Sequence, residues 1–230
     1  MRRLLMVVAV IVAVVMVAGM ASATLLGIQA NYEGNRPDIE FDNTGIIEYD
    51  AVMNLFTLTA TDDTLVLPDG TTYQLTGDDY TTTLTLKIYV DESGNLTRGV
   101  CGYDMVEKVT EGSVTIAGVT YNTDDVLLQA EVKAFGWDHI DSINTDAFDF
   151  LFDTISGGLV TQGIWPSPTP LTAAWVNVSS SNSIDWINGF TISPAKGDKM
   201  PTPEPTTLLL LGSGLIGLAG IGRRKFKKGS

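Results

Sequence analysis

The chain is poor in the residues that most often carry chemistry. Among its 230 residues there is one cysteine, Cys101, and one histidine, His139. A single cysteine excludes an internal disulfide, so the fold must be held together by its core. A Ser-His-Asp or Cys-His arrangement would rest on His139 alone, and no G-x-S-x-G motif accompanies it. We therefore expect no enzymatic activity, and we interpret Cys101 as a small buried core residue.

Positive charge is also scarce outside the two ends of the chain. Between residues 24 and 203, seven Lys and Arg face 26 Asp and Glu, which gives this segment a net charge of −19. So acidic a surface repels nucleic acid and anionic lipid, and it favours solubility or the binding of multivalent cations. Nucleic acid is therefore excluded as an expected partner.

The acidic residues include three pairs of neighbouring aspartates, Asp62-Asp63, Asp78-Asp79 and Asp124-Asp125. Each pair falls at an expected strand edge or turn, where aspartate is common and where loop carboxylates can also gather around calcium. No D-x-[DN]-x-[DN]-G loop is present. We predict no cofactor and no metal site with named ligands, and a structural calcium ion stays an open alternative.

Amphipathic helices are missing from the middle of the chain, whereas strand patterns are abundant. In residues 83–90, apolar Leu84, Leu86, Ile88 and Val90 alternate with other side chains, the period-2 pattern of a strand with one buried face. Turn signals recur about every ten residues, which is typical of antiparallel sandwiches and barrels. We predict an all-β body over residues 24–193, an antiparallel, jelly-roll-like β-sandwich. Its expected strands lie near 55–60, 83–90, 114–121, 127–135 and 184–192.

Four tryptophans, Trp137, Trp165, Trp175 and Trp186, provide the remaining functional hint. An exposed indole ring beside polar side chains is a common platform for sugar rings. Trp186 alternates with Ile184 and is expected in the core. Trp165 stands beside three prolines in an expected loop, so it is the candidate sugar contact.

The first 23 residues have the layout of a secretory signal peptide. Arg2 and Arg3 precede an apolar stretch over residues 4–17, and Ala21 and Ala23 follow with the spacing of an A-x-A cleavage site. We predict that signal peptidase recognises these two alanines and cuts after the second. An uncleaved N-terminal anchor is the alternative, and in either case the body is exported.

The other end of the chain has the layout of a membrane segment. Residues 206–222 carry no charge, and as a helix they span about 25 Å, enough for a short transmembrane helix. Polar residues 194–202 ahead of them are predicted to form a linker. A basic cluster follows and is expected to stay in the cytoplasm. Its members are Arg223, Arg224, Lys225, Lys227 and Lys228.

The order of these C-terminal parts closely resembles the PEP-CTERM sorting signal. In that family a Pro-Glu-Pro motif precedes one membrane helix and a basic tip, and exosortase, an integral-membrane enzyme with a cysteine nucleophile, recognises and processes the signal. Carried onto residues 203–228, Pro203, Glu204 and Pro205 are the recognition motif and the basic cluster is the stop signal. The family often has Val before the motif, where this chain has Thr202. The body resembles no family.

The resemblance implies an address and partners. Signal peptidase, exosortase and, before processing, the inner membrane are the expected partners. The mature protein is expected at the cell envelope, on the outer surface or outside the cell, in Gram-negative bacteria that often make exopolysaccharide. We predict a non-enzymatic, structural or biofilm-associated role, with polysaccharide as a further candidate partner. The alternative is a carbohydrate-binding or carbohydrate-active domain on the same scaffold.

Overall fold

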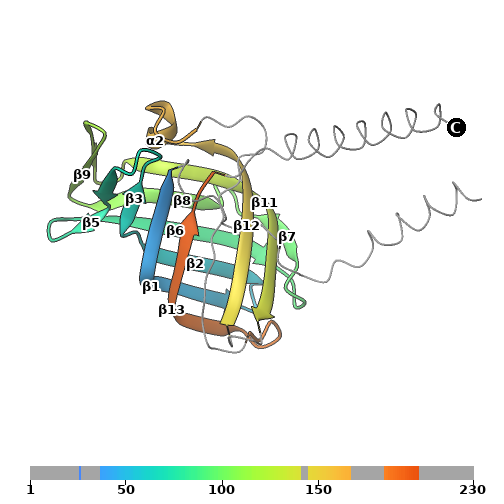
Figure 1. Ribbon diagram of the computed structural model, residues 1–230. Helices are drawn as coiled ribbons and strands as arrows, with labels where there is room; N and C mark the ends of the chain where they lie inside the picture. Colours follow the sequence, from blue (N-terminus) through green and yellow to red (C-terminus); the bar gives the residue numbers. More distant parts are fainter. Residues whose placement is uncertain (1–25, 27–36, 141–144, 167–183, 202–230) are drawn as a thin grey trace, which may run out of the picture.

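The computed structural model describes residues 26, 37–140, 145–166 and 184–201, which form an all-β domain (Figure 1). The first strands are β1 (Asp38–Asp50), β2 (Leu55–Thr61), β3 (Thr64–Val66), β4 (Thr72–Gln74), β5 (Thr76–Gly77), β6 (Tyr80–Val90) and β7 (Leu96–Gly99). They are followed by β8 (Met105–Glu111), β9 (Ser113–Ile116), β10 (Val119–Asn122), β11 (Val126–Ile140), β12 (Thr145–Ser156), helix α2 (Gly158–Thr161) and β13 (Phe190–Lys199).

Eleven of these strands form a single antiparallel sheet, and β9 and β10 form a separate hairpin. Along the sheet, β12, β11, β8, β6, β2 and β1 are neighbours, and β13 returns to pair with β1. β3 pairs with β1 and β4 with β3, while β5 and β7 pair with β6. The main strands thus follow chain order, as in a meander. The predicted body was jelly-roll-like, and this strand order differs from that of a jelly roll.

The sheet wraps over itself into two layers, which confirms an antiparallel, sandwich-like body. Figure 1 shows β1, β13, β12 and the end of β11 in front of β2, β6 and β8. Register shifts interrupt the β1–β13 ladder near Gly45 and the β11–β12 ladder near Val132. Bulges of this kind let long strands bend from one layer into the other.

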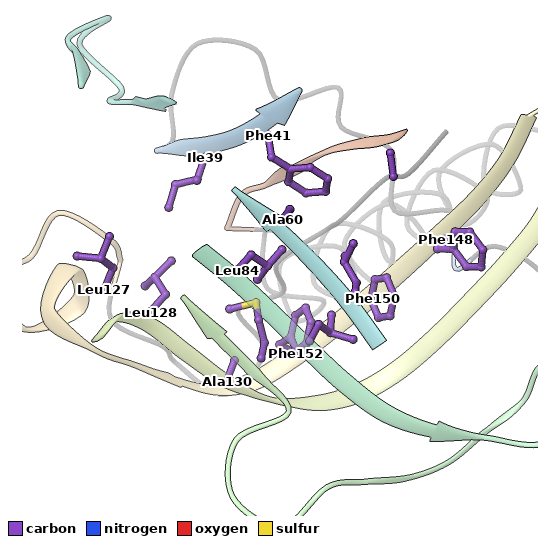
Figure 2. Packing of buried hydrophobic residues seen from close by; sticks show 14 of the residues in the cluster. Ile39, Phe41, Ala60, Leu84, Leu127, Leu128, Ala130, Phe148, Phe150 and Phe152 are labelled. Carbon is purple, nitrogen blue, oxygen red and sulfur yellow. The ribbon is translucent and has the colours of Figure 1, made fainter. Parts of the chain in front are cut away.

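Apolar side chains from both layers fill the space between them. Figure 2 shows Phe148, Phe150 and Phe152 of β12 in the same cluster as Ala60 of β2 and Leu84 of β6, and all five are buried. Period-2 alternation places such residues on one face of each strand. Burial of this apolar surface is the main favourable contribution to folding.

One part of this core is almost entirely aromatic, and we call it the aromatic cluster. It surrounds Trp186, whose ring centroid lies 4.8 Å from that of Tyr49 and 5.0 Å from that of Phe190. Its members are Tyr49, Phe56, Phe135, Trp137, Trp186 and Phe190. The predicted core position of Trp186 is therefore confirmed.

Four of the five predicted strand windows are confirmed by β2, β6, the β9–β10 hairpin and β11. The fifth, 184–192, is wrong for its first half, because Asp185 caps a turn there. Its Oδ1 atom accepts hydrogen bonds of 3.0 Å from the N–H groups of Ile187 and Asn188. Aspartate side chains commonly stabilise turns in this way.

The predicted linker is also corrected, since residues 194–199 belong to β13. Its polar composition suggested a linker, but pairing with β1 gives these residues hydrogen-bond partners that no local pattern reveals. Among the described residues, no helix is long and apolar enough to cross a membrane. The expected membrane helix at 206–222 lies outside them.

Candidate functional site

Three core-lining segments each place one charged residue in an inward-facing position. In β2 the side chains at 56, 58 and 60 are buried, and the next residue of this series is Asp62. In β8 Glu107 lies between buried positions 105 and 109, and in β13 Lys199 follows buried positions 195 and 197. Because alternate residues of a strand share a face, all three point into the interior. We call them the charged cluster.

The three side chains of the charged cluster meet. Lys199 Nζ donates a hydrogen bond to Asp62 Oδ1 and lies 3.0 Å from Glu107 Oε2. The second contact has the distance of an ion pair without the geometry of a well-formed hydrogen bond. All three side chains are 0% exposed. One ammonium group therefore lies beside two carboxylates, out of reach of bulk water.

The surroundings satisfy this cluster only in part. The Phe41 ring centroid lies 5.7 Å from Lys199 Nζ. Thr82 of β6 is buried beside Asp62, and the backbone N–H of Asp62 donates a hydrogen bond of 3.2 Å to the Thr82 carbonyl oxygen. Asp62 Oδ2, Thr82 Oγ1 and Glu107 Oε1 have no hydrogen-bond partner among the described residues. Buried polar atoms are usually paired, so these three mark a site with unused hydrogen-bonding capacity.

The electrostatics of the cluster favour an extra proton. Burial, and then the nearby Glu107 carboxylate, raise the pKa of Asp62 to about 8, although the Lys199 ammonium opposes the rise. Burial lowers the pKa of Lys199, but the Asp62 and Glu107 carboxylates outweigh it and the net direction is upward. Two carboxylates and one ammonium in an apolar interior retain a proton that water would otherwise take from Asp62.

Further acidic groups lie next to the charged cluster, at the start of β1 and the end of β13. Burial, followed by the charges of Asp198 and Glu40, raises the pKa of Asp38 to about 7, while Lys199 opposes this. Burial also raises the pKa of Asp198. Within the described ranges, no group of three or more His, Cys, Asp or Glu residues is arranged to hold a metal ion.

Two sequence-based interpretations are wrong. Trp165, the candidate sugar contact, is 0% exposed, because the turn after α2 folds it onto the core, where its backbone N–H donates a hydrogen bond of 3.0 Å to the Leu159 carbonyl oxygen. The neighbouring prolines suggested a surface loop, but they do not decide where the indole lies. Cys101, expected in the core, is exposed in the bend between β7 and β8.

The remaining candidate residues have ordinary structural contacts. His139 Nδ1 lies 2.7 Å from Asp146 Oδ1 across the β11–β12 ladder. Asp124 forms an exposed ion pair of 2.8 Å with Lys108, and Asp78 and Asp79 are exposed. Of the three aspartate pairs, only Asp62-Asp63 has a member in the charged cluster.

The targeting residues lie outside the described part of the chain: Ala21, Ala23, Pro203, Glu204, Pro205 and the basic cluster from Arg223 to Lys228. A family model for the PEP-CTERM protein-sorting motif matches residues 201–225. The chain carries a PEP-CTERM motif. Such a motif implies an exported protein that exosortase processes, on its way through a membrane-anchored precursor to the cell envelope. No curated protein and no solved structure matches the chain.

The PEP-CTERM match begins where the domain ends. β13 closes at Lys199, and the matched segment starts at residue 201, whose side chain is still buried. Lys199 of the charged cluster therefore lies two residues before the first residue of the sorting segment. Sequence reasoning missed the cluster, although continuing the alternation of 56, 58 and 60 by one step reaches Asp62.

Proposed function

We propose that this PEP-CTERM protein is a non-enzymatic structural component of the cell envelope or the extracellular matrix, where it accompanies exopolysaccharide. The PEP-CTERM motif at residues 201–225 carries the proposal, because it supplies the address. A compact, acidic β-domain supports a scaffolding role, since its high negative charge favours solubility.

The direct join between β13 and the sorting motif supports the same role. A protein that is anchored or released through its C-terminal segment transmits any load on that segment into its last strand. Here the last strand pairs with β1 along its length and ends in the charged cluster. The body is therefore built to hold its C-terminal end firmly.

A carbohydrate-binding or carbohydrate-active domain is the alternative, and the structure weakens its main support. Among the described tryptophans, Trp165 and Trp186 are buried and Trp137 is half-buried. A glycan array and a reducing-sugar assay with the full-length protein separate the two functions. Glycan binding without turnover would replace the structural role by a binding role, and turnover of a glycan would contradict a non-enzymatic protein.

Sorting is tested by fractionation and mass measurement in cells that contain exosortase. We expect the wild-type protein to lose residues Arg223 to Lys228, whereas Glu204→Ala should stay membrane-bound with its tail intact. Replacing the five basic residues with neutral ones should let the tail slip through the membrane uncut, because the charges that retain it are gone. Glu92→Ala changes an exposed acidic residue of the body and serves as the matched control, with wild-type processing expected. A mature wild-type protein that keeps the basic cluster would contradict exosortase processing.

A further inference from the structure

We propose that Lys199 and Asp62 join through an intramolecular amide, an isopeptide bond between Nζ and Cγ, and that Glu107 transfers the protons this step requires. All three residues precede the sorting motif, so the inference goes beyond the proposed function and does not depend on it. The structure supports the bond through contact, burial, proton supply and position in the fold.

Contact is the first requirement. Lys199 Nζ touches Asp62 Oδ1, and Glu107 Oε2 lies 3.0 Å from the same nitrogen. The residues come from β13, from the β2–β3 junction and from β8, and the sheet holds each backbone in place. Reacting groups fixed side by side behave as if at very high effective concentration, because the entropy of bringing them together has already been lost in folding.

Burial is the second requirement, since water both solvates an ammonium and reverses amide formation. The Lys199, Asp62 and Glu107 side chains are 0% exposed. In such a medium desolvation disfavours both charges, so a neutral amine beside a neutral carboxylic acid is less costly than it is in water, even though the two carboxylates raise the net pKa of Lys199. The raised pKa of Asp62, caused mainly by burial and by Glu107, agrees with a carboxyl group that is already protonated.

The chemical step is a condensation that needs no other reactant. Asp62 already holds a proton, so Lys199 first passes one proton to the Glu107 carboxylate, which leaves a neutral amine beside two neutral acids. The amine lone pair attacks Asp62 Cγ, and Glu107 donates its proton to the departing hydroxyl. The C–O bond breaks, and one water molecule leaves. Glu107 then takes the surplus proton from nitrogen. The products are a neutral amide, water and a protonated Glu107, so the cluster keeps the same charge throughout.

The unused hydrogen-bonding capacity of the site suits this step. Asp62 Oδ2 and Thr82 Oγ1 are both buried without a partner among the described residues. Asp62 Oδ2 becomes the oxygen that carries developing negative charge when nitrogen attacks. The Thr82 hydroxyl, on the adjacent strand β6, is the candidate donor to Asp62 Oδ2 after the hydroxyl group rotates toward that oxygen.

The position of the bond explains what it would accomplish. Asp62 and Lys199 are 137 residues apart, and Lys199 ends the last strand, directly before the sorting motif. A covalent link at this point closes residues 62–199, which contain β3 to β13, into one loop and leaves β1 and β2 outside it. Load applied through the C-terminal segment then passes into the β2–β3 junction through a covalent bond, and no longer through the hydrogen bonds between β13 and β1.

The test is a tryptic digest of the purified full-length chain, followed by tandem mass spectrometry. We expect the segments that contain Asp62 and Lys199 to be recovered as one branched peptide, lighter than their sum by one water molecule, with no cleavage after Lys199. The exposed pair Lys108–Asp124, 2.8 Å apart, is an internal control that should yield only separate peptides. Separate Asp62 and Lys199 peptides from a protein with a β-sheet circular dichroism spectrum would overturn the bond, and so would equal cross-linking of the control pair.

Glu107→Gln tests the role of the third residue while it keeps both bonding partners and the side-chain shape. We expect the branched peptide to accumulate ~100-fold more slowly after synthesis, the effect typical of a lost general acid–base group. Lys199→Arg should yield none. Glu111→Gln, at the exposed end of the same strand, is the matched control and should cross-link at the wild-type rate. Wild-type kinetics in Glu107→Gln would overturn the assignment of Glu107.

Discussion

The aromatic cluster and the charged cluster lie at opposite ends of the same strand pair, and they hold the domain together in different ways. At one end Phe190 of β13 pairs with Tyr49 of β1, and at the other Lys199 pairs with Ile39. Around Trp186, stability comes from buried apolar area and ring packing, which are largely non-directional. Around Lys199 it depends on three charged groups that compensate one another, so the removal of any one of them leaves the others unpaired in the core.

This difference shows that inward alternation can serve two purposes in one fold. The same period-2 pattern that buries Phe56, Leu58 and Ala60 also buries Asp62. The aromatic end should therefore tolerate a change of ring, whereas the charged end should be sensitive to the loss of a single proton donor or acceptor. The sorting motif is joined to the sensitive end.

The largest expected effect is that of Lys199→Ala. It removes a cross-link that closes a loop of 137 residues, and we expect the free energy of unfolding to fall by about 5 kcal/mol. Even if the wild-type protein held only an ion pair here, Lys199→Ala would leave two carboxylates unpaired in the core and lower the free energy of unfolding by about 3–5 kcal/mol. Urea unfolding followed by circular dichroism measures the loss. Lys196→Ala, an exposed neighbour on β13, is the control and should leave stability nearly unchanged.

Trp186→Ala should have the next largest effect, about 3–4 kcal/mol, because it leaves a cavity among five aromatic rings. Trp186→Phe should lower the unfolding free energy by only about 1 kcal/mol, since most of the apolar volume is kept. Thermal and urea unfolding of the two variants give the ratio. Equal losses would show that the aromatic cluster is as specific as the charged one.

A smaller effect is expected from pH at the charged end. The folded protein holds a proton on Asp38 up to about pH 7, whereas the unfolded chain releases it near 3.8. Unfolding therefore releases a proton, and this group lowers stability as pH rises from 3.8 to about 7. Between these two pH values, Asp38 should account for about 1–2 kcal/mol of the fall in the free energy of unfolding, after allowance for solvent screening. Asp38→Asn should remove this part of the pH dependence. Unfolding free energies measured across this pH range test the sign, which a steeper slope in the variant would contradict.

The smallest effect is expected from Lys108→Ala, which breaks the exposed ion pair with Asp124. Both side chains are solvated, 40% and 78% exposed, so the pair should contribute less than about 1 kcal/mol. Raising the salt concentration should weaken even this contribution. A loss as large as that of Lys199→Ala would mean that burial is not what distinguishes the two lysine–aspartate contacts.

Much of the fold was predictable because alternation is a local property. Strands β2, β6, β9, β10 and β11 all fall in windows whose apolar residues recur at every second position. The failures occur where local composition and tertiary partners disagree. Asp185 caps a turn inside an expected strand, and a segment with proline, glycine and lysine becomes β13 because β1 supplies its partners.

The candidate site was only half visible for the same reason. Asp62 and Glu107 each extend or interrupt an apolar series, so their inward orientation follows from the pattern. Lys199 belongs to no such series in the sequence, and its burial depends on pairing with Ile39 of β1, 160 residues earlier in the chain (199 minus 39). Trp165 shows the converse, since a loop composition did not prevent its ring from being buried.

The sequence by itself determined the address and the class of fold, because a sorting motif is read as a linear segment and alternation is a short-range property. Only the tertiary structure decided that β13 closes the sheet beside β1 and that one lysine reaches two acids from distant strands. Those contacts join residues far apart in the chain, and no local rule encodes the distance between them. The chemistry of the body is therefore a property of its closed sheet.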